Sequence, residues 1–450
     1  MIRLAMPLLA LLLLQAAGRA SGQEAISIEE PPPESASADK SSIEKIFSPA
    51  KERERITDWL ENQLKDEPAF LRDATLFANF RTYYLRQDHF DATTSEAWSL
   101  GGSIGLRSGY LFERFAIGAT GYTSLPIYAP ADRSGTFLLK PNQDSYSVVG
   151  ELYGKLRITD DLLATAYRQE LSTPYIDRDD RLMTPNTFEG YTLVGSWSPG
   201  ADEGKLIYGG GWVTKMKDQN SERFVSMSEE AGVAIDRGVA LAGASYVTKN
   251  GSIGLFDYFS NDVINIGYAE GKYSREFESG VAVLGAAQFT DQHSTGNDLL
   301  TGSSFAGNQV GVKVACSYAG AMATLGYSNT TRGTSLRSPW SSYPGYTSGQ
   351  VEDFNRAAEQ AFMLKTSYVF SGVGLPGFTA YALWIHGFGV APSVGSNEDE
   401  YDFDLQWRPG LPKLKGLSFR ARLAMVNQRG GAPATLDEYQ LIMNYDFAAL

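Results

Sequence analysis

The chain has 450 residues, of which 43% are hydrophobic and 20% charged, and it contains 24 tyrosines, 23 phenylalanines and 7 tryptophans. Abundant aromatic side chains and a low charge content exclude a disordered chain. A net charge of -13 argues against a nucleic-acid partner, because phosphate backbones are also anionic. One cysteine and three histidines predict neither an internal disulfide nor a dedicated metal site, and we expect no cofactor.

The N-terminus has the organisation of a secretory signal peptide. Arg3 precedes an apolar run over residues 8–14, and small residues follow as far as Gly22. The run is too short for a membrane-spanning helix, which needs about 20 apolar residues. We therefore expect residues 1–22 to be a signal peptide and the mature protein to be exported.

Residues 23–72 are predicted to be a periplasmic extension in two parts. Residues 23–40 are rich in proline, serine and glutamate, which is typical of a flexible linker. In residues 41–70 apolar side chains such as Trp59 recur at roughly helical spacing between lysines and glutamates. This spacing predicts a short amphipathic helix, acting as a spacer or cap, or alternatively binding a partner.

From residue 73 to the end, apolar and polar residues alternate with a period of two. The pattern is clear over residues 401–408 and 417–423, and it holds with one exception over residues 439–447. Alternation of this kind predicts β-strands with two different faces. A soluble sandwich also alternates, so three further features are needed to identify the fold.

Those features favour a membrane barrel. The alternating segments fill the chain, their apolar faces often end in aromatic residues such as Tyr401 and Trp407, and their other faces carry charges suited to a wet lumen. A spanning sheet must close, since unpaired backbone groups are costly in hydrocarbon. The predicted strands begin near residues 74, 97, 112, 145, 161, 188, 205, 239, 251, 263, 280, 308, 321, 361, 377, 401, 416 and 437.

The fold class is therefore predicted to be all-β. We expect an eighteen-stranded antiparallel transmembrane β-barrel over residues 73–450, with a short N-terminal helical extension, in the lipid of a bacterial outer membrane. Closure predicts that residues 74–85 pair with residues 437–447, and that Phe447 faces lipid.

Four connections are much longer than the usual loop of about 4–6 residues. They cover residues 125–144, 172–187, 218–237 and 331–360. The last contains three aromatic residues that a solvated loop does not need. We predict that it folds into the lumen and forms a constriction, with Asp353 near the pore. The constriction residues are Trp340, Tyr343 and Tyr346.

If the apolar side chains of each strand face lipid, the side chains at the alternate positions line the lumen. The predicted lumen residues are Arg81, Tyr83, Arg107, Lys155, Arg157, Arg408, Arg420 and Arg422. Barrel closure brings most of the arginines onto neighbouring strands, and guanidinium groups bind carboxylates through paired hydrogen bonds. The alternative is that they only pair with nearby acids. Those acids are Asp402, Asp404, Glu438 and Asp446.

An enzymatic function is not expected. Residues 101–105 fit the G-x-S-x-G pattern of a nucleophile elbow, but that motif needs a strand-to-helix turn and Ser103 lies inside an alternating segment. The three histidines are scattered along the chain. A purely structural barrel would need a lumen plugged by apolar side chains, which the polar parity does not favour.

Several stretches, taken in this order and spacing, carry a family resemblance. They are residues 81–84 (RTYY), 181–190 (RLMTPNTFEG), 265–271 (NIGYAEG), 353–356 (DFNR), 374–377 (GLPG) and 414–422 (LKGLSFRAR). The chain resembles the OprD-type substrate-specific porins of Gram-negative outer membranes over most of its length after residue 73.

The resemblance implies a monomeric eighteen-stranded barrel that admits small water-soluble carboxylates, such as amino acids, short peptides and aromatic acids. It also implies a basic ladder along the lumen, to which Arg81, Arg420 and Arg422 match, and a loop acid at Asp353. The chain departs from the family at Gln440, where an arginine is common. The alternatives are a weakly selective general diffusion porin and an outer-membrane barrel hydrolase.

Overall fold

The computed structural model describes residues 64, 66–200, 203–340, 343–411, 414–429 and 434–448. The predicted signal peptide and linker, and most of the predicted amphipathic helix, lie outside the described residues. A single helical turn, α4 (Ala69–Arg72), precedes the first strand. No helix among the described residues is long and apolar enough to cross a membrane.

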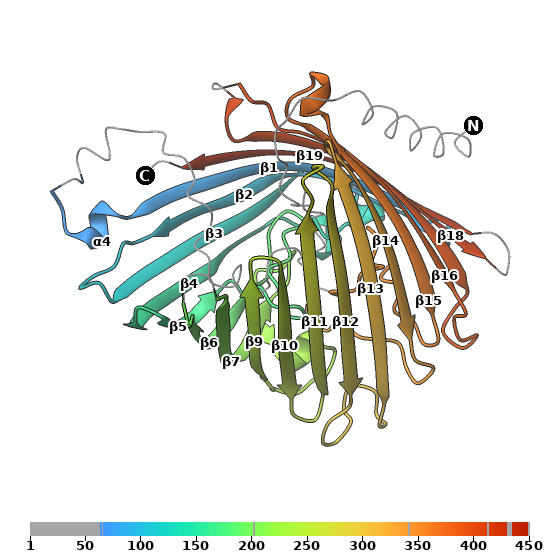
Figure 1. Ribbon diagram of the computed structural model, residues 1–450, viewed down its shortest axis with the longest axis horizontal. Helices are drawn as coiled ribbons and strands as arrows, with labels where there is room; N and C mark the ends of the chain where they lie inside the picture. The colour runs from blue at the N-terminus through green and yellow to red at the C-terminus, as the bar shows by residue number, and fades with distance from the viewer. Residues whose placement is uncertain are drawn as a thin grey trace.

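The strands form one antiparallel ring in which β19 lies beside β1 (Figure 1). They are β1 (Thr75–Asp88), β2 (Thr94–Arg107), β3 (Phe115–Tyr128), β4 (Tyr146–Thr159), β5 (Leu162–Gln169), β6 (Thr187–Trp197), β7 (Lys205–Lys217), β8 (Val225–Ser226), β9 (Val239–Thr248), β10 (Gly251–Ser260), β11 (Ile264–Glu276), β12 (Ala282–His293), β13 (Ala306–Tyr318), β14 (Ala321–Thr330), β15 (Gln360–Val369), β16 (Phe378–Phe388), β17 (Asn397–Trp407), β18 (Leu417–Arg429) and β19 (Thr435–Ala448). The short helices are η2 (Ala131–Arg133), η3 (Pro141–Gln143), α5 (Met227–Glu230) and η4 (Phe370–Val373).

The eighteen-stranded barrel is confirmed. The described part of the chain has 19 strands, of which β8 is a two-residue addition to β7 and the other eighteen close the ring. Every predicted strand start lies within four residues of an observed one. The closing register runs from Phe77 opposite Ala448 to Asp88 opposite Asp437, as the sequence predicts.

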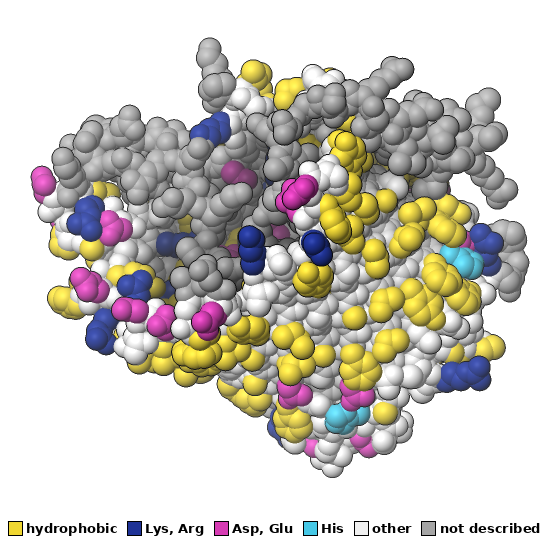
Figure 2. Space-filling model, viewed as in Figure 1, with side chains coloured by type: hydrophobic (Ala, Val, Ile, Leu, Met, Phe, Trp, Pro, Cys, Tyr) yellow, Lys and Arg dark blue, Asp and Glu magenta, His cyan; other side chains and the backbone are white. Residues whose placement is uncertain are grey.

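The outer face of the ring is apolar. Side chains such as Phe80, Ile104 and Leu441 are 58%, 62% and 58% exposed, respectively, on the strand face opposite the lumen. Figure 2 shows hydrophobic side chains spread over the strands, with most charged side chains near the margins. At the end of the barrel where β1 begins and β19 ends, the rings of Phe378, Trp407 and Phe419 stack in a row with centroids 5.5 and 5.7 Å apart. An aromatic row at one end of an apolar band suits the edge of a bilayer.

The four long connections leave the end of the barrel opposite the start of β1 and the end of β19. They cover residues 129–145, 170–186, 218–238 and 331–359, while turns such as 160–161 and 319–320 lie at the end where β1 starts. Figure 1 shows connecting segments inside the ring of strands. Loop 170–186 joins β5 to β6, and loop 331–359 joins β14 to β15.

One side of the lumen is packed rather than wet. Loop side chains such as Tyr175, Met227 and Trp340 form an apolar cluster with inward-facing residues of β6 to β11, including Tyr258 and Ile266. The sequence predicts polar inward faces on all strands, so this apolar packing inside the lumen differs from the prediction. It arises because the inward positions of β10 and β11 are largely apolar or aromatic, and the loops supply apolar partners for them.

Candidate solute path

Loop 331–359 lies inside the barrel, where the sequence predicts it. Trp340, Tyr343 and Tyr346 are at most 6% exposed. Trp340 Nε1 donates a hydrogen bond to the backbone carbonyl of Met227 over 2.9 Å. The Tyr346 hydroxyl donates to Glu270 on β11 over 2.8 Å, and the Tyr343 hydroxyl donates to Gln309 on β13. The three rings therefore fix one side of this loop to the packed side of the lumen.

The other side of the same loop is held by acids on β17 and β19. The backbone N–H groups of Val351 and Glu352 donate to the two carboxylate oxygens of Glu400 over 2.7 and 2.9 Å. The backbone N–H of Gln350 donates to Asp402 over 2.9 Å, and its side chain donates to Glu438 over 2.8 Å. The loop thus crosses the lumen between two opposite walls.

Asp353 lies near the second inward loop. Its carboxylate accepts a hydrogen bond of 2.7 Å from the Ser348 hydroxyl. Removal from water raises the pKa of Asp353, while the Ser348 hydrogen bond and the charge of Arg181 oppose that rise. Arg181 belongs to loop 170–186, so its charge influences Asp353 from the second inward loop.

Arg420 and Arg422 face the lumen from alternate positions of β18. Their Nε atoms lie 2.6 and 3.1 Å from the same oxygen of Asp404. Arg422 also donates to Gln440 over 3.2 Å and to the Tyr381 hydroxyl over 3.4 Å. The structure therefore brings both arginines together and pairs them with one of the acids that the alternative interpretation names.

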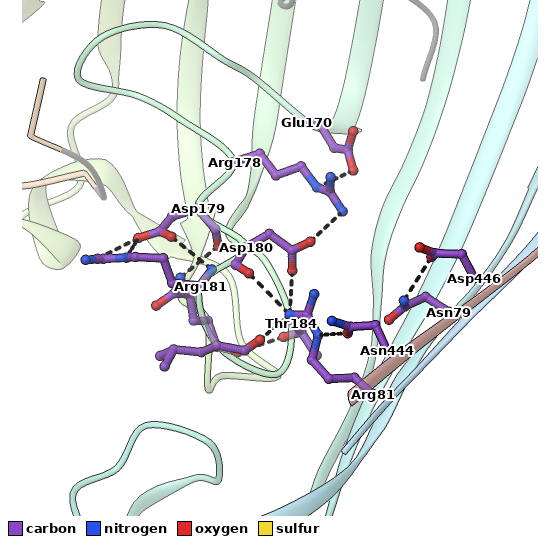
Figure 3. A network of polar contacts seen from close by, with 12 residues as sticks. Asn79, Arg81, Glu170, Arg178, Asp179, Asp180, Arg181, Thr184, Asn444 and Asp446 are labelled. Carbon is purple, nitrogen blue, oxygen red and sulfur yellow. Dashed lines mark hydrogen bonds and ion pairs between the residues drawn. The ribbon is translucent and has the colours of Figure 1, made fainter. Parts of the chain in front are cut away.

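Arg81 has a different environment. Its Nε donates to Asn444 Oδ1 over 2.7 Å. Its Nη1 lies 2.9 Å from Asp180 Oδ1 and also donates to the backbone carbonyls of Asp180, over 3.2 Å, and of Leu182 (Figure 3). Arg81 faces the lumen as predicted, but these contacts bind it to loop 170–186.

The other predicted lumen cations divide into two groups. Arg107, Lys155 and Arg157 face inward near the end of the barrel where β1 begins, and each lies over an aromatic ring at 4.8, 5.0 and 4.0 Å, respectively. Arg408 is exposed and directly follows the end of β17. It therefore lies in a connecting turn, outside the group formed by Arg420 and Arg422. The alternating pattern there continues one residue beyond the strand.

Tyr83 faces inward and is 1% exposed. It packs in a small apolar cluster with Leu138 of loop 129–145 and Met183 of loop 170–186. Ser103 lies within β2, so the G-x-S-x-G segment is a continuous strand rather than a strand-to-helix elbow.

Three lumen lysines were missed by the sequence analysis. Lys272 and Lys313 lie on one register row, with Ala286 between them. Lys313 Nζ is 4.8 Å from the Tyr346 ring, Lys365 Nζ is 4.7 Å from the Tyr381 ring, and Lys272 Nζ is 3.0 Å from Glu270. The alternating pattern could have predicted the inward direction of Lys313, because this residue lies between the outward-facing Val312 and Val314.

A closed ring that is apolar outside, charged inside and crossed by two inward loops defines a channel of the bacterial outer membrane. The sequence matches the family model described as outer membrane porin, OprD family, over residues 68–449. The chain therefore belongs to the OprD family of porins, as the resemblance predicts. A search of the curated proteins found no match.

Solved porin structures have the same fold. Pseudomonas aeruginosa OccK9 (OpdG) is 22% identical, with 85% of this chain and 100% of that chain covered, and has a TM-score of 0.76. P. aeruginosa OccK2 (OpdF) is 19% identical with the same coverage and a TM-score of 0.75. P. aeruginosa OpdK, solved with vanillate, is 20% identical over 84% of this chain and 100% of that chain, with a TM-score of 0.72.

Proposed function

We propose that this porin passes small carboxylate-bearing solutes, such as amino acids, short peptides and aromatic acids, along Arg420 and Arg422. The observation that carries the proposal is the sharing of one Asp404 carboxylate by two guanidinium groups. Two guanidinium groups facing one carboxylate form a basic site whose N–H donors match the geometry of a carboxylate. A solute carboxylate exchanges onto these donors while Asp404 holds the forks in place.

The arrangement of the lumen acids also supports the proposal. Glu400, Asp402 and Glu438 accept hydrogen bonds from loop 331–359, so these carboxylates have a structural role. Lys365 and Lys313 extend the row of positive side chains on neighbouring walls. The narrow path is thus lined by cations whose charges a solute carboxylate can follow from site to site.

A weakly selective diffusion porin is the second candidate. Asp404 lies within salt-bridge distance of both arginines, and this pairing favours a channel in which their charges are partly neutralised. We further propose that the barrel acts as a monomer, because the β1–β19 pairing closes it within one chain, and that it has no catalytic activity.

The experiment compares solute flux in wild type and in the double variant Arg420→Ala/Arg422→Ala. Liposome uptake and reversal potentials are measured for benzoate, vanillate, arginine and glucose; vanillate is included because OpdK was solved with it. Loss of a charge-assisted contact of about 1–2 kcal/mol predicts a roughly 5- to 30-fold fall in carboxylate flux. Glucose flux should stay nearly constant.

Arg408→Ala is the matched control, because Arg408 is an exposed arginine outside the lumen group. It should leave all four fluxes unchanged. Equal losses for carboxylates and glucose in the double variant would favour the general diffusion porin.

A further inference from the structure

We propose that Arg81 is a positioning residue that pins loop 170–186 to the barrel wall and so holds Arg181 opposite Asp353. The proposal rests on the proposed function in one respect, that solutes pass this constriction. Arg81 would then shape the path without binding the solute itself.

The guanidinium of Arg81 is engaged on two sides. Asn444 on β19 holds Nε at 2.7 Å, which orients the group within the wall. Nη1 is directed at the loop, where it meets the Asp180 carboxylate at 2.9 Å and the backbone carbonyls of Asp180 and Leu182. Binding to the backbone carbonyls of Asp180 and Leu182, on either side of Arg181, fixes the backbone of the loop as well as its charge.

The loop also depends on Arg81 for charge balance. Figure 3 shows Arg178 bridging Glu170 and Asp180, with Nε–Oε1 and Nη2–Oδ2 distances of 2.6 and 3.6 Å. Arg181 pairs with Asp179 at 2.6 Å. Within this loop segment, the three carboxylates of Glu170, Asp179 and Asp180 face two loop arginines, and Arg81 supplies a third guanidinium. Removing Arg81 leaves the Asp180 carboxylate with the long contact of 3.6 Å to Arg178.

The opposite edge of the loop has its own attachment. Gln219 Nε2 donates to the backbone carbonyl of Asp179 over 2.7 Å, and the Thr184 hydroxyl donates to the backbone carbonyl of Gln219 over 2.7 Å. The segment that carries Arg181 is therefore held between loop 218–238 and β1. The first attachment is neutral and the second is ionic, so a change at Arg81 should release one edge alone.

The consequence concerns where Arg181 stands. Arg181 lies close enough to Asp353 for each charge to shift the pKa of the other, upward for Arg181 and downward for Asp353. If the β1 edge is released, we expect this pair to separate and the solute path beside loop 170–186 to widen. Widening raises the flux of every small solute, whereas loss of a solute-binding arginine lowers the flux of carboxylates.

The test uses the full-length porin in liposomes, with Arg81→Ala and Arg81→Lys compared with wild type. Trypsin added on the side of the long loops reports release, because it cuts after Arg178 and Arg181. We expect Arg81→Ala to speed this cleavage by about tenfold, the effect of losing about 1.4 kcal/mol of loop attachment. Glucose uptake should rise and the benzoate-to-glucose ratio should fall. Arg81→Lys should give intermediate values, because lysine lacks the planar fork.

Two further variants separate positioning from other effects. Asp180→Asn should reproduce Arg81→Ala, and the double variant should be no more susceptible to trypsin than either single one, because both break the same contact. Arg86→Ala is the matched control: Arg86 lies on the same strand but on the outer parity, paired with Asp88 at 2.9 Å. It should leave cleavage and uptake unchanged.

Opposite results would overturn the proposal. If Arg81→Ala leaves the loop resistant to trypsin and lowers benzoate flux with glucose unchanged, Arg81 is a solute-binding residue. If the Arg420/Arg422 variant has no effect on carboxylate flux while Arg81→Ala releases the loop, the proposed function fails and the positioning role stands. Heat-dependent gel mobility verifies that each variant is a folded barrel.

Discussion

The two inward loops reach the same lumen by different physical means. Loop 331–359 is anchored by buried aromatic rings on one side and by backbone N–H groups on a carboxylate at the other. Loop 170–186 also has buried apolar contacts, but the Arg81–Asp180 ion pair attaches it to β1, and the acid of that pair and the loop's own Arg178 are each 34% exposed. Burial of aromatic area is insensitive to salt, whereas exposed ion pairs are screened by it. We therefore expect loop 331–359 to be fixed on one side of the solute path and loop 170–186 to be adjustable on the other.

The strongest test of whether loop 331–359 is fixed in the lumen is the variant Trp340→Ala. Truncating a buried tryptophan costs about 3–5 kcal/mol, and the hydrogen bond to Met227 is lost as well. We expect loop 331–359 to leave the packed side of the lumen, with a several-fold rise in single-channel conductance. Trp212→Ala is the control, because Trp212 is 45% exposed on the outer face. An unchanged conductance in Trp340→Ala would mean that the loop does not narrow the channel.

The second test addresses the carboxylate end of the same loop. Glu400→Gln leaves one acceptor oxygen for two backbone N–H groups and removes the negative charge, at a cost of about 1–3 kcal/mol. We expect frequent transitions between conductance levels in bilayer recordings, with a smaller mean increase than in Trp340→Ala. Glu278→Gln, in an exposed turn, should record like wild type. Recordings of Glu400→Gln without such transitions would mean that the aromatic rings alone keep the loop in place.

Salt should distinguish the two loops directly. The Debye length falls from about 10 Å at 0.1 M salt to about 3 Å at 1 M, which weakens partly exposed ion pairs. Trypsin cleavage after Arg178 and Arg181 should therefore rise a few-fold over this range. Chymotrypsin cleavage after Tyr343 and Tyr346, whose rings are each 6% exposed, should not change. Equal salt responses would remove the distinction between the loops.

The smallest expected effect is a pH dependence from Glu352 in loop 331–359. Removal from water and the charge of Glu398 raise the pKa of Glu352 to about 7, while Arg356 opposes this. A carboxyl group with a raised pKa binds its proton more tightly in the docked loop than in the released loop. Docking is therefore favoured below the ordinary pKa and weakens as pH rises towards 7. Conductance noise should grow modestly between pH 5 and pH 8, and Glu352→Gln should remove that growth. A persistent pH response in this variant would point to another group.

The local pattern predicted the barrel well, because a period of two records which face of each strand meets lipid. The inward direction of Arg420 and the pairing of β1 with β19 follow from parity and closure. Parity does not reveal partners that are distant in sequence, so the attachment of Arg81 to Asp180 was not foreseen. Nor does it mark the end of a strand, which is why Arg408 was placed in the lumen.

The packed side of the lumen was missed for a related reason. In β10 and β11 both parities carry apolar or aromatic residues, and a pattern without contrast does not say which face is covered by a loop. The covering residues, such as Tyr175 and Trp340, lie more than about 60 residues away from these strands along the chain. Their aromatic character alone supported the prediction that loop 331–359 turns inward.

The pairing of β1 with β19 also constrains how the molecule is made. A ribosome produces β1 first and β19 last, so the hydrogen-bonding edge of β1 has no permanent neighbour until the final strand is complete. A chain interrupted before Thr435 would present two open edges, those of β1 and β18, which hydrocarbon does not tolerate. Closure of the ring thus requires the last strand, and a chain that lacks it cannot pair the edges that a membrane barrel must pair.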